Sequence, residues 1–185
     1  MHGYMKIPEL KRVCHAMEIS INEYLVSVYI WSVYTECLHG MPSKCPIRVA
    51  VPVNLRPYFN SITTKNFFVM VSAEFHPTKE TYTFAEVAAI VKESLRSQIN
   101  RENLEKLFSY NVSNEKLLIA RVVPLFLKNL AMKYVYTTSA LANTATITNI
   151  GNISVTEEYR PYVEMFHAFL AMSKGQHLKG TICSY

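Results

Sequence analysis

The chain has 185 residues, of which 50% are apolar and 18% are charged, so it is long enough for one domain with its own core and too short for two. This composition excludes a disordered chain, because disorder requires low hydrophobicity and a high density of charge. The net charge of +5 comes from basic residues that are scattered along the sequence, so we expect no nucleic-acid partner.

The first half of the chain predicts two helices followed by two strands. The helices are expected over Pro8 to Met17 and over Tyr24 to Leu38, where apolar residues recur at helical spacing. β-branched and apolar residues predict strands over Ile47 to Val53 and over Asn66 to Phe75. Both sets of alternating side chains in the second strand are fairly apolar, so we expect a sheet that is covered on both faces.

Two short motifs predict where helices begin. Ser20 with Glu23, and Thr83 with Glu86, have the spacing of a capping box, in which each side chain bonds the backbone amide of the other residue. The second box opens a helix that is expected to end near Ile99.

The second half of the chain predicts further helices and then strands. Helical patterns resume near Asn103 and again from Ser113 to Tyr134, with a kink or break expected at Pro124 because proline lacks an amide donor. Small residues predict a loop over Thr137 to Thr144, and Ile153 to Val155 is expected to extend the strand before it or to form a neighbour. Strands are predicted at three places: Ala145–Ile150, ended by Gly151, Tyr162–Ala171 and Thr181–Tyr185.

This order of elements predicts the fold class. Helices and strands occur in blocks instead of a regular βαβ alternation, which is typical of an α+β fold. We therefore expect a two-layer sandwich of a mixed, largely antiparallel sheet with helices packed on it, forming a single subdomain over residues 1–185.

Cysteines and histidines give little sign of local chemistry. The four cysteines lack metal-type spacing and no secretory segment precedes them, so we expect reduced thiols, a cytoplasmic protein and no metal site. The longest apolar runs are too short to cross a bilayer, so no membrane span is expected. The six histidines are isolated in sequence, and we assign no catalytic residue.

Three segments nevertheless carry a resemblance to a known family. They are Val51 to Arg56 (VPVNLR) with Lys65 to Phe68 (KNFF), Asn111 to Tyr134, and Thr146 to Gly151 (TITNIG) leading to Tyr162. Their order and spacing resemble the C-terminal subdomain of chloramphenicol-acetyltransferase-like folds, in the branch of the alcohol acetyltransferases and condensation domains.

The resemblance implies half of a CoA-dependent acyltransferase fold. Such proteins join two similar subdomains around a channel, and the first subdomain carries an HHxxxDG motif whose second histidine is the general base. The present sequence has no HHxxxDG and no paired histidines. We therefore expect a truncated chain whose partner is the missing N-terminal subdomain. No cofactor is expected to bind tightly, and an acyl-CoA or acyl-carrier thioester is the expected co-substrate.

The resemblance also implies positions for candidate site residues. Thr148 stands where the family usually has the serine of a Ser-Asn-Leu-Gly strand, so its hydroxyl could donate to an oxyanion; alternatively it is only a strand former. Asn149 and Gly151 are expected to shape the end of that strand. Arg56 and Asn66 either line the channel or brace the loop, with Arg56 paired to a carboxylate and Asn66 holding backbone.

Two functions stay open from the sequence. One is acyl transfer from a thioester to an alcohol or amine, inactive in this chain alone because the base is missing. The other is a stand-alone, non-catalytic binding or scaffold module that self-associates. The chain has twelve tyrosines and nine phenylalanines, and if it is half of a two-subdomain protein, part of this aromatic content should lie on exposed apolar surface.

Overall fold

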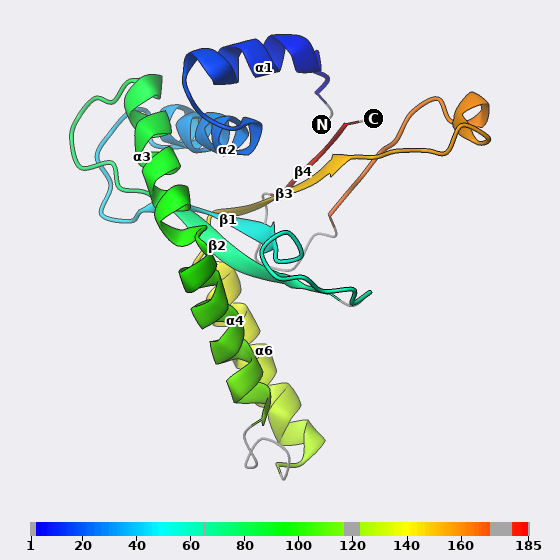
Figure 1. The fold of residues 1–185 in the computed structure, drawn as a ribbon. Helices are drawn as coiled ribbons and strands as arrows, with labels where there is room; N and C mark the ends of the chain where they lie inside the picture. Colours follow the sequence, from blue (N-terminus) through cyan, green and yellow to red (C-terminus); the bar gives the residue numbers. More distant parts are fainter. Residues whose placement is uncertain (1–2, 65, 117–122, 171–178, 185) are drawn as a thin grey trace. The chain divides into compact units, whose positions relative to one another are not determined.

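The structure is a computed structural model that describes residues 3–64, 66–116, 123–170 and 179–184 (Figure 1). It is an α+β fold with a four-stranded mixed sheet in the order β2-β1-β3-β4. The helices and strands are α1 (Ile7–Ala16), α2 (Ile21–Ser32), η1 (Val33–Cys37), β1 (Ile47–Asn54), β2 (Phe68–Phe75), α3 (Phe84–Gln98), α4 (Arg101–Lys116), α6 (Leu125–Leu141), β3 (Ala145–Asn152), η2 (Arg160–Tyr162) and β4 (Lys179–Ser184).

The chain divides into two compact units that share strands β1 and β2. The first unit comprises residues 1–49 and 72–97, and the second comprises residues 50–71 and 98–185. The first unit therefore holds helices α1 to α3, whereas the second holds α4, α6, β3 and β4.

An aromatic cluster forms the core of the first unit. The buried Tyr34 ring contacts Phe75 and Tyr82 edge to face, with ring centroids 5.6 and 5.9 Å apart. The Tyr34 hydroxyl donates to the Gly40 carbonyl at 2.7 Å, so the buried phenol is hydrogen-bonded. The half-buried Trp31 ring also contacts Tyr34, with ring centroids 5.7 Å apart.

Both predicted capping boxes are present. The Ser20 hydroxyl accepts from the Glu23 amide at 3.1 Å, and the Glu23 carboxylate accepts from the Ser20 amide at 2.7 Å. Thr83 and Glu86 make the same two contacts at 3.3 and 2.7 Å. These boxes satisfy amide donors that have no partner within the helix, and they set the first turns of α2 and α3.

A smaller apolar cluster anchors α4 in the second unit. Leu55, Val69 and Leu104 are almost fully buried and join the β1–β2 end to the helix. Phe67 and Phe108 pack beside them, edge to face, with ring centroids 5.3 Å apart. This cluster fixes where the loop after β1 leaves the sheet.

The sheet contains both antiparallel and parallel neighbours. β1 and β2 run in opposite directions (Figure 1), but β3 and β4 pair in parallel, with Thr148 opposite Thr181. The sheet is therefore mixed, as expected, and β3 and β4 form a parallel pair within it. Parallel neighbours need a long crossover, and more than twenty residues separate these two strands in the sequence, a separation that local patterns do not reveal.

The two faces of β2 are unequally covered. Val69, Val71 and Ala73 are buried, whereas Phe68 and Met70 are 48% and 45% exposed. The expectation of cover on both faces was therefore wrong at this end of the strand. Apolar residues such as Phe68 and Met70 occur both in cores and on exposed surfaces that bind ligands, so their apolar character alone does not predict burial.

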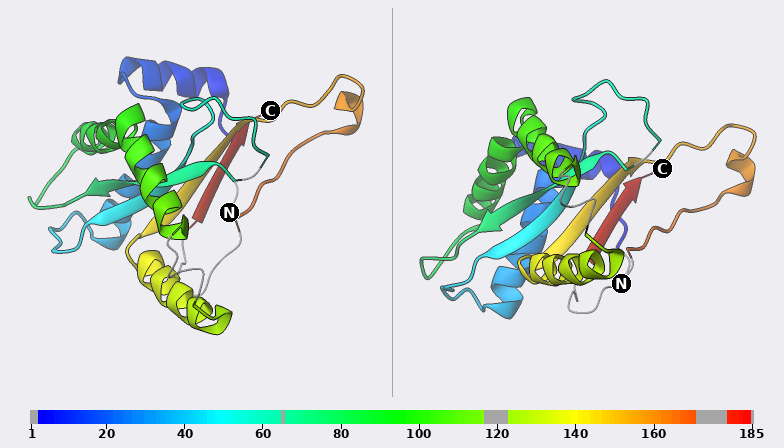
Figure 2. Two further views of the ribbon diagram at one scale, coloured as in Figure 1. Left: turned by 60° about the horizontal axis from the view of Figure 1, so that its bottom comes forward. Right: turned by 90° about the horizontal axis from the view of Figure 1, so that it is seen from below.

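Two predicted segments have a different structure. Residues 137–141, expected in a loop, continue α6, where the Thr137 and Thr138 hydroxyls donate to the Lys133 and Tyr134 carbonyls. Residues 153–155 and 163–170 contain no strand, and this stretch extends away from β3 (Figure 2). Residue 171, the last of the predicted Tyr162–Ala171 strand, lies outside the described residues.

The remaining boundaries follow the predictions closely. α4 ends at Lys116 and α6 begins at Leu125, directly after Pro124, as the expected break requires. β4 confirms the last predicted strand up to Ser184; Tyr185 lies outside the described residues. Within the described part of the chain, no helix is both long enough and apolar enough to cross a membrane.

Candidate functional site

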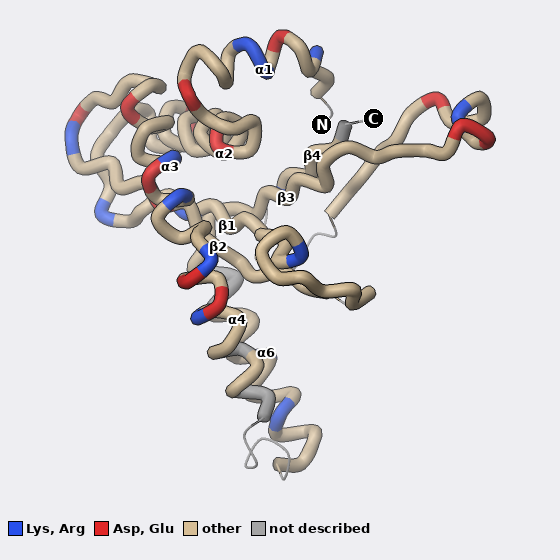
Figure 3. Tube along the Cα trace, viewed as in Figure 1, with Lys and Arg blue, Asp and Glu red and all other residues tan. Residues whose placement is uncertain are grey.

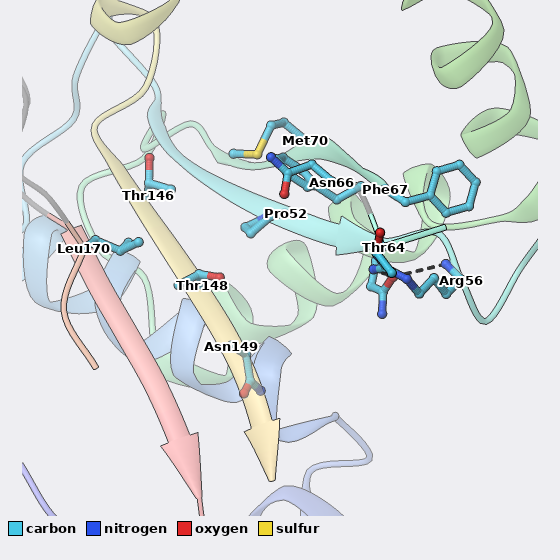
Figure 4. Close-up of a pocket in the computed structure, with 12 residues that line it drawn as sticks. Pro52, Arg56, Thr64, Asn66, Phe67, Met70, Thr146, Thr148, Asn149 and Leu170 are labelled. Carbon is cyan, nitrogen blue, oxygen red and sulfur yellow. Dashed lines mark hydrogen bonds between the residues drawn. The ribbon is translucent and has the colours of Figure 1, made fainter. Parts of the chain in front are cut away.

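The second unit has an open pocket of about 430 Å³ on the uncovered face of its sheet (Figure 4). Its floor comes from alternate residues of three adjacent strands: Pro52 and Asn54 of β1, Phe68 and Met70 of β2, and Thr146 and Thr148 of β3. Because side chains two residues apart in a strand share a face, these six lie on one side of the sheet.

The residues between them turn to the opposite, buried face. Val51, Val69 and Ile147 are each less than 5% exposed. The open face therefore lies directly above a packed layer of buried side chains. The ordinary alternation of side chains along regular strands is enough to place the pocket residues on this face. The strand segments 50–54, 68–71 and 145–152 contain no charged residue (Figure 3).

Arg56 supplies a charge at one end of the pocket. Its backbone amide donates to the Asn54 side-chain oxygen at 3.1 Å, and its guanidinium donates to the same oxygen at 3.4 Å and to the Thr63 carbonyl at 3.1 Å. These two acceptors brace the loop that follows β1. Arg56 also lines the pocket, and whether it acts on a substrate or only braces the loop stays a prediction.

Two uncharged polar side chains, Asn66 and Thr148, line the same space. Thr148 is half-buried, and Asn66 is exposed just before β2 begins. Figure 4 marks hydrogen bonds at Arg56, but none at Thr148 or Asn66 among the residues drawn. A hydroxyl and an amide in this position can donate to an oxygen atom of a bound molecule.

Asn149 and Gly151 shape the end of the β3 ladder. Gly151 has a φ of +79°, a conformation that other residues rarely adopt, and the pairing with β4 is irregular between these two residues. The Asn149 side-chain oxygen accepts from the Gly151 amide at 2.8 Å. β3 continues to Asn152, so Gly151 marks a bulge in the strand and not its end.

The structure gathers four of the five candidate residues at one pocket. Arg56, Asn66, Thr148 and Asn149 line it, although about 80 residues separate the two pairs in the sequence, and Gly151 lies next to it in the chain without being among its described lining residues. Whether these residues act as the resemblance implies stays a prediction.

Sequence reasoning missed the apolar part of the pocket. Pro52, Met70 and Leu170 were not singled out, yet they line it. One signal was available in the alternation of the strands. Thr146 lies two residues before Thr148 and therefore shares its face of β3, and Phe68 and Met70 share one face of β2 in the same way.

A second polar cluster lies in the first unit. Arg48 donates to both carboxylate oxygens of Glu74, at 2.9 and 3.1 Å, and His76 contacts the same carboxylate. The hydrogen bonds from Arg48, and then from His76, hold the pKa of the Glu74 carboxyl below its usual value despite partial burial. Because Arg48 already neutralises Glu74, we interpret the cluster as a cross-strand ion pair.

No group of three or more histidine, cysteine, aspartate or glutamate residues is placed to hold a metal ion within the ranges that the structure describes.

The comparisons with known proteins add no relative. A scan against models of protein families finds no match, and a search of curated proteins finds none either.

Proposed function

We propose that this chain forms one half of an acyl-transfer site, equivalent to the C-terminal subdomain of an alcohol acetyltransferase or condensation domain. The observation that supports the proposal is the convergence of two motif segments on one pocket. Arg56 and Asn66 come from the first segment, and Thr148 and Asn149 come from the third.

The proposed reaction assigns a task to these residues. The oxygen or nitrogen of the acceptor attacks the carbonyl carbon of a thioester, a new C–O or C–N bond forms, and the C–S bond breaks. The proton of the acceptor passes to a base, and the departing thiolate is protonated to the thiol. The Thr148 hydroxyl would donate to the oxyanion that develops on the carbonyl oxygen, and the apolar floor would hold the alkyl part of the acceptor.

The base is the group that these 185 residues do not supply. The sequence contains no HHxxxDG, so in the proposal the histidine comes from another polypeptide segment. The chain alone should therefore bind an acceptor but should not turn it over. A thiol-release assay with acetyl-CoA and a panel of primary alcohols and amines should give the rate of the buffer control. Robust release that depends on the protein would contradict this half of the proposal.

Binding is tested separately on the protein with ¹³C-labelled methionine methyl groups. Met70 lines the pocket, whereas Met41 is an exposed methionine of the first unit and serves as the control. The Met70 signal is identified by Met70→Leu. Acetyl-CoA or octan-1-ol should shift the Met70 signal and leave Met41 unchanged. If neither compound moves Met70, the pocket is not an acyl-transfer site.

A second candidate function is self-association through α6, favoured by its exposed apolar side chains. They include Leu125, Phe126, Leu130, Met132 and Tyr134, each more than 60% exposed. A non-catalytic scaffold module would cover such residues with a second copy. Sedimentation over a range of concentrations tests this: a discrete oligomer that Leu130→Glu converts to monomer supports the module, and a monomer at all concentrations refutes it.

A further inference from the structure

We propose that Phe68 and Met70 are specificity-determining residues, which hold the far end of the acceptor's alkyl chain and so select alcohols by chain length. The inference deepens the proposed function and rests on it, because that function places the reacting end of the acceptor at Thr148. Three features of the second unit support it: the register of β1 with β2, the change of polarity across the sheet, and the exposure of the two side chains.

The register of β1 with β2 places Met70 directly beside Pro52. The Leu55 amide donates to the Phe67 carbonyl at 3.0 Å. In an antiparallel pair such a bond joins residues that lie opposite each other, so three residues farther along the strands Pro52 lies opposite Met70. The cross-strand ion pair described above has the same register. Pro52 and Met70 therefore form a continuous apolar surface on the open face.

The polarity of the open face changes from one strand to the next. β3 contributes the hydroxyls of Thr146 and Thr148, whereas β2 contributes the apolar side chains of Phe68 and Met70. Pro52 lies between these pairs, because β1 lies between β2 and β3 in the sheet. An alcohol whose hydroxyl lies at Thr148 therefore finds an apolar path across the strands toward β2 (Figure 4).

The width of this path limits the length of the chain. β3 and β2 are two strand spacings apart, roughly 10 Å, which an extended alkyl chain of about eight carbons spans. Phe68 and Met70 are nearly half exposed, so a chain that reaches them removes apolar surface from water. A shorter chain ends over Pro52 and gains nothing from β2.

Leu170 is the apolar residue toward which a chain could run in the opposite direction. Its half-buried side chain also lines the pocket, and in Figure 4 it lies on the β4 side of β3, whereas β1 and β2 lie on the other side. A chain directed to Leu170 would leave Phe68 and Met70 uncovered. Truncation of Leu170 is therefore the matched control for truncation of Met70.

The experiment measures the affinity of the 185-residue chain for butan-1-ol, hexan-1-ol and octan-1-ol. Threonine methyl groups are labelled with ¹³C, and the Thr148 methyl, identified by Thr148→Ser, reports binding at the reacting end. We expect affinity to rise about twofold per methylene, because the open floor covers each methylene only in part.

Met70→Ala should weaken octan-1-ol about threefold and leave butan-1-ol unchanged, since only the longer chain reaches β2. Met70→Gln keeps the length of this exposed side chain and should give the same length-dependent loss, which guards against a folding defect in the alanine variant. Leu170→Ala should leave the dependence on chain length as it is in the wild type.

Equal affinity of the wild type for the three alkanols overturns the inference, and so does an equal loss for all of them in the Met70 variants. A length-dependent loss in Leu170→Ala instead of Met70→Ala overturns the direction of the chain. If acetyl-CoA moves the Met70 signal and no alkanol binds, the inference fails and the proposed function stands. If neither acetyl-CoA nor octan-1-ol moves it, both fail.

Discussion

Replacing Glu23 with glutamine removes a carboxylate that joins three parts of the first unit. The side chain is 8% exposed and accepts hydrogen bonds from the Ser20 amide at 2.7 Å and from Arg96 at 2.8 and 3.2 Å. Loss of a capping partner costs on the order of 1 kcal/mol, and loss of a charge-assisted hydrogen bond to a half-exposed arginine costs a similar amount. We expect Glu23→Gln to lower the free energy of unfolding by about 2 kcal/mol at neutral pH.

The effect should depend on pH in a defined direction. Burial alone would raise the pKa of the Glu23 carboxyl, but hydrogen bonds from Arg96 and Ser20 outweigh it and hold the pKa below its usual value. A carboxyl with a lowered pKa in the folded state stabilises the fold above its unfolded pKa, about 4.3, and this stabilisation is lost as the pH falls through the folded value. The difference between wild type and Glu23→Gln should therefore shrink below about pH 4.

Urea unfolding followed by the fluorescence of Trp31, the one tryptophan, measures both effects in the unit that contains Glu23. Glu9→Gln serves as the control, because Glu9 lies on the exposed surface of α1 with Lys6 3.7 Å away. It should leave the transition unchanged. The reasoning is refuted if Glu23→Gln unfolds at the wild-type urea midpoint, or if its deficit is as large at about pH 3 as at neutral pH.

Three further substitutions test the structure elsewhere. Gly151→Ala should lower the free energy of unfolding in urea by roughly 1 kcal/mol. An added Cβ meets no atom within 4 Å, so the cost comes only from the backbone strain of an alanine at a φ of +79°. An unchanged free energy of unfolding would contradict this φ. Tyr34→Phe removes the hydrogen bond to the Gly40 carbonyl, so it should lower the free energy of unfolding, measured by Trp31 fluorescence, by about 1 kcal/mol. An unchanged free energy of unfolding would show that this hydrogen bond does not stabilise the fold. Leu104→Ala should lower the free energy of unfolding by roughly 2–5 kcal/mol, because the side chain is fully buried. Urea unfolding of the whole chain, followed by circular dichroism, measures this loss. A loss below about 1 kcal/mol would contradict the packing of Leu104 against Leu55.

Features that depend on neighbouring residues were predictable from the sequence. The Ser20 and Thr83 capping boxes need only a hydroxyl and a carboxylate three residues apart, and both formed as expected. The helix break at Pro124 follows in the same way from a missing amide donor.

Features that depend on distant partners were not predictable. Residues 163–170 alternate like a strand but are not assigned as one, since alternation alone does not supply the partner strand that a sheet requires. The α6 extension past Thr137 was hidden because threonine favours loops and strands, yet its hydroxyl is satisfied by the Lys133 carbonyl within the helix. Pairing of β1 with β3 creates the pocket floor, and no local signal places residue 52 near residue 148.

The strand order also bears on how the pocket forms in time. β1 and β2 are close in the sequence, whereas β1 and β3 are adjacent in the sheet with α3, α4 and α6 between them along the chain. Closing so long a loop is entropically costly, so we expect the β1–β2 pair to form first and β3 to dock late. Since the floor needs all three strands, a ligand can recognise only the chain in which β3 has docked, and its binding should slow unfolding more than it speeds folding.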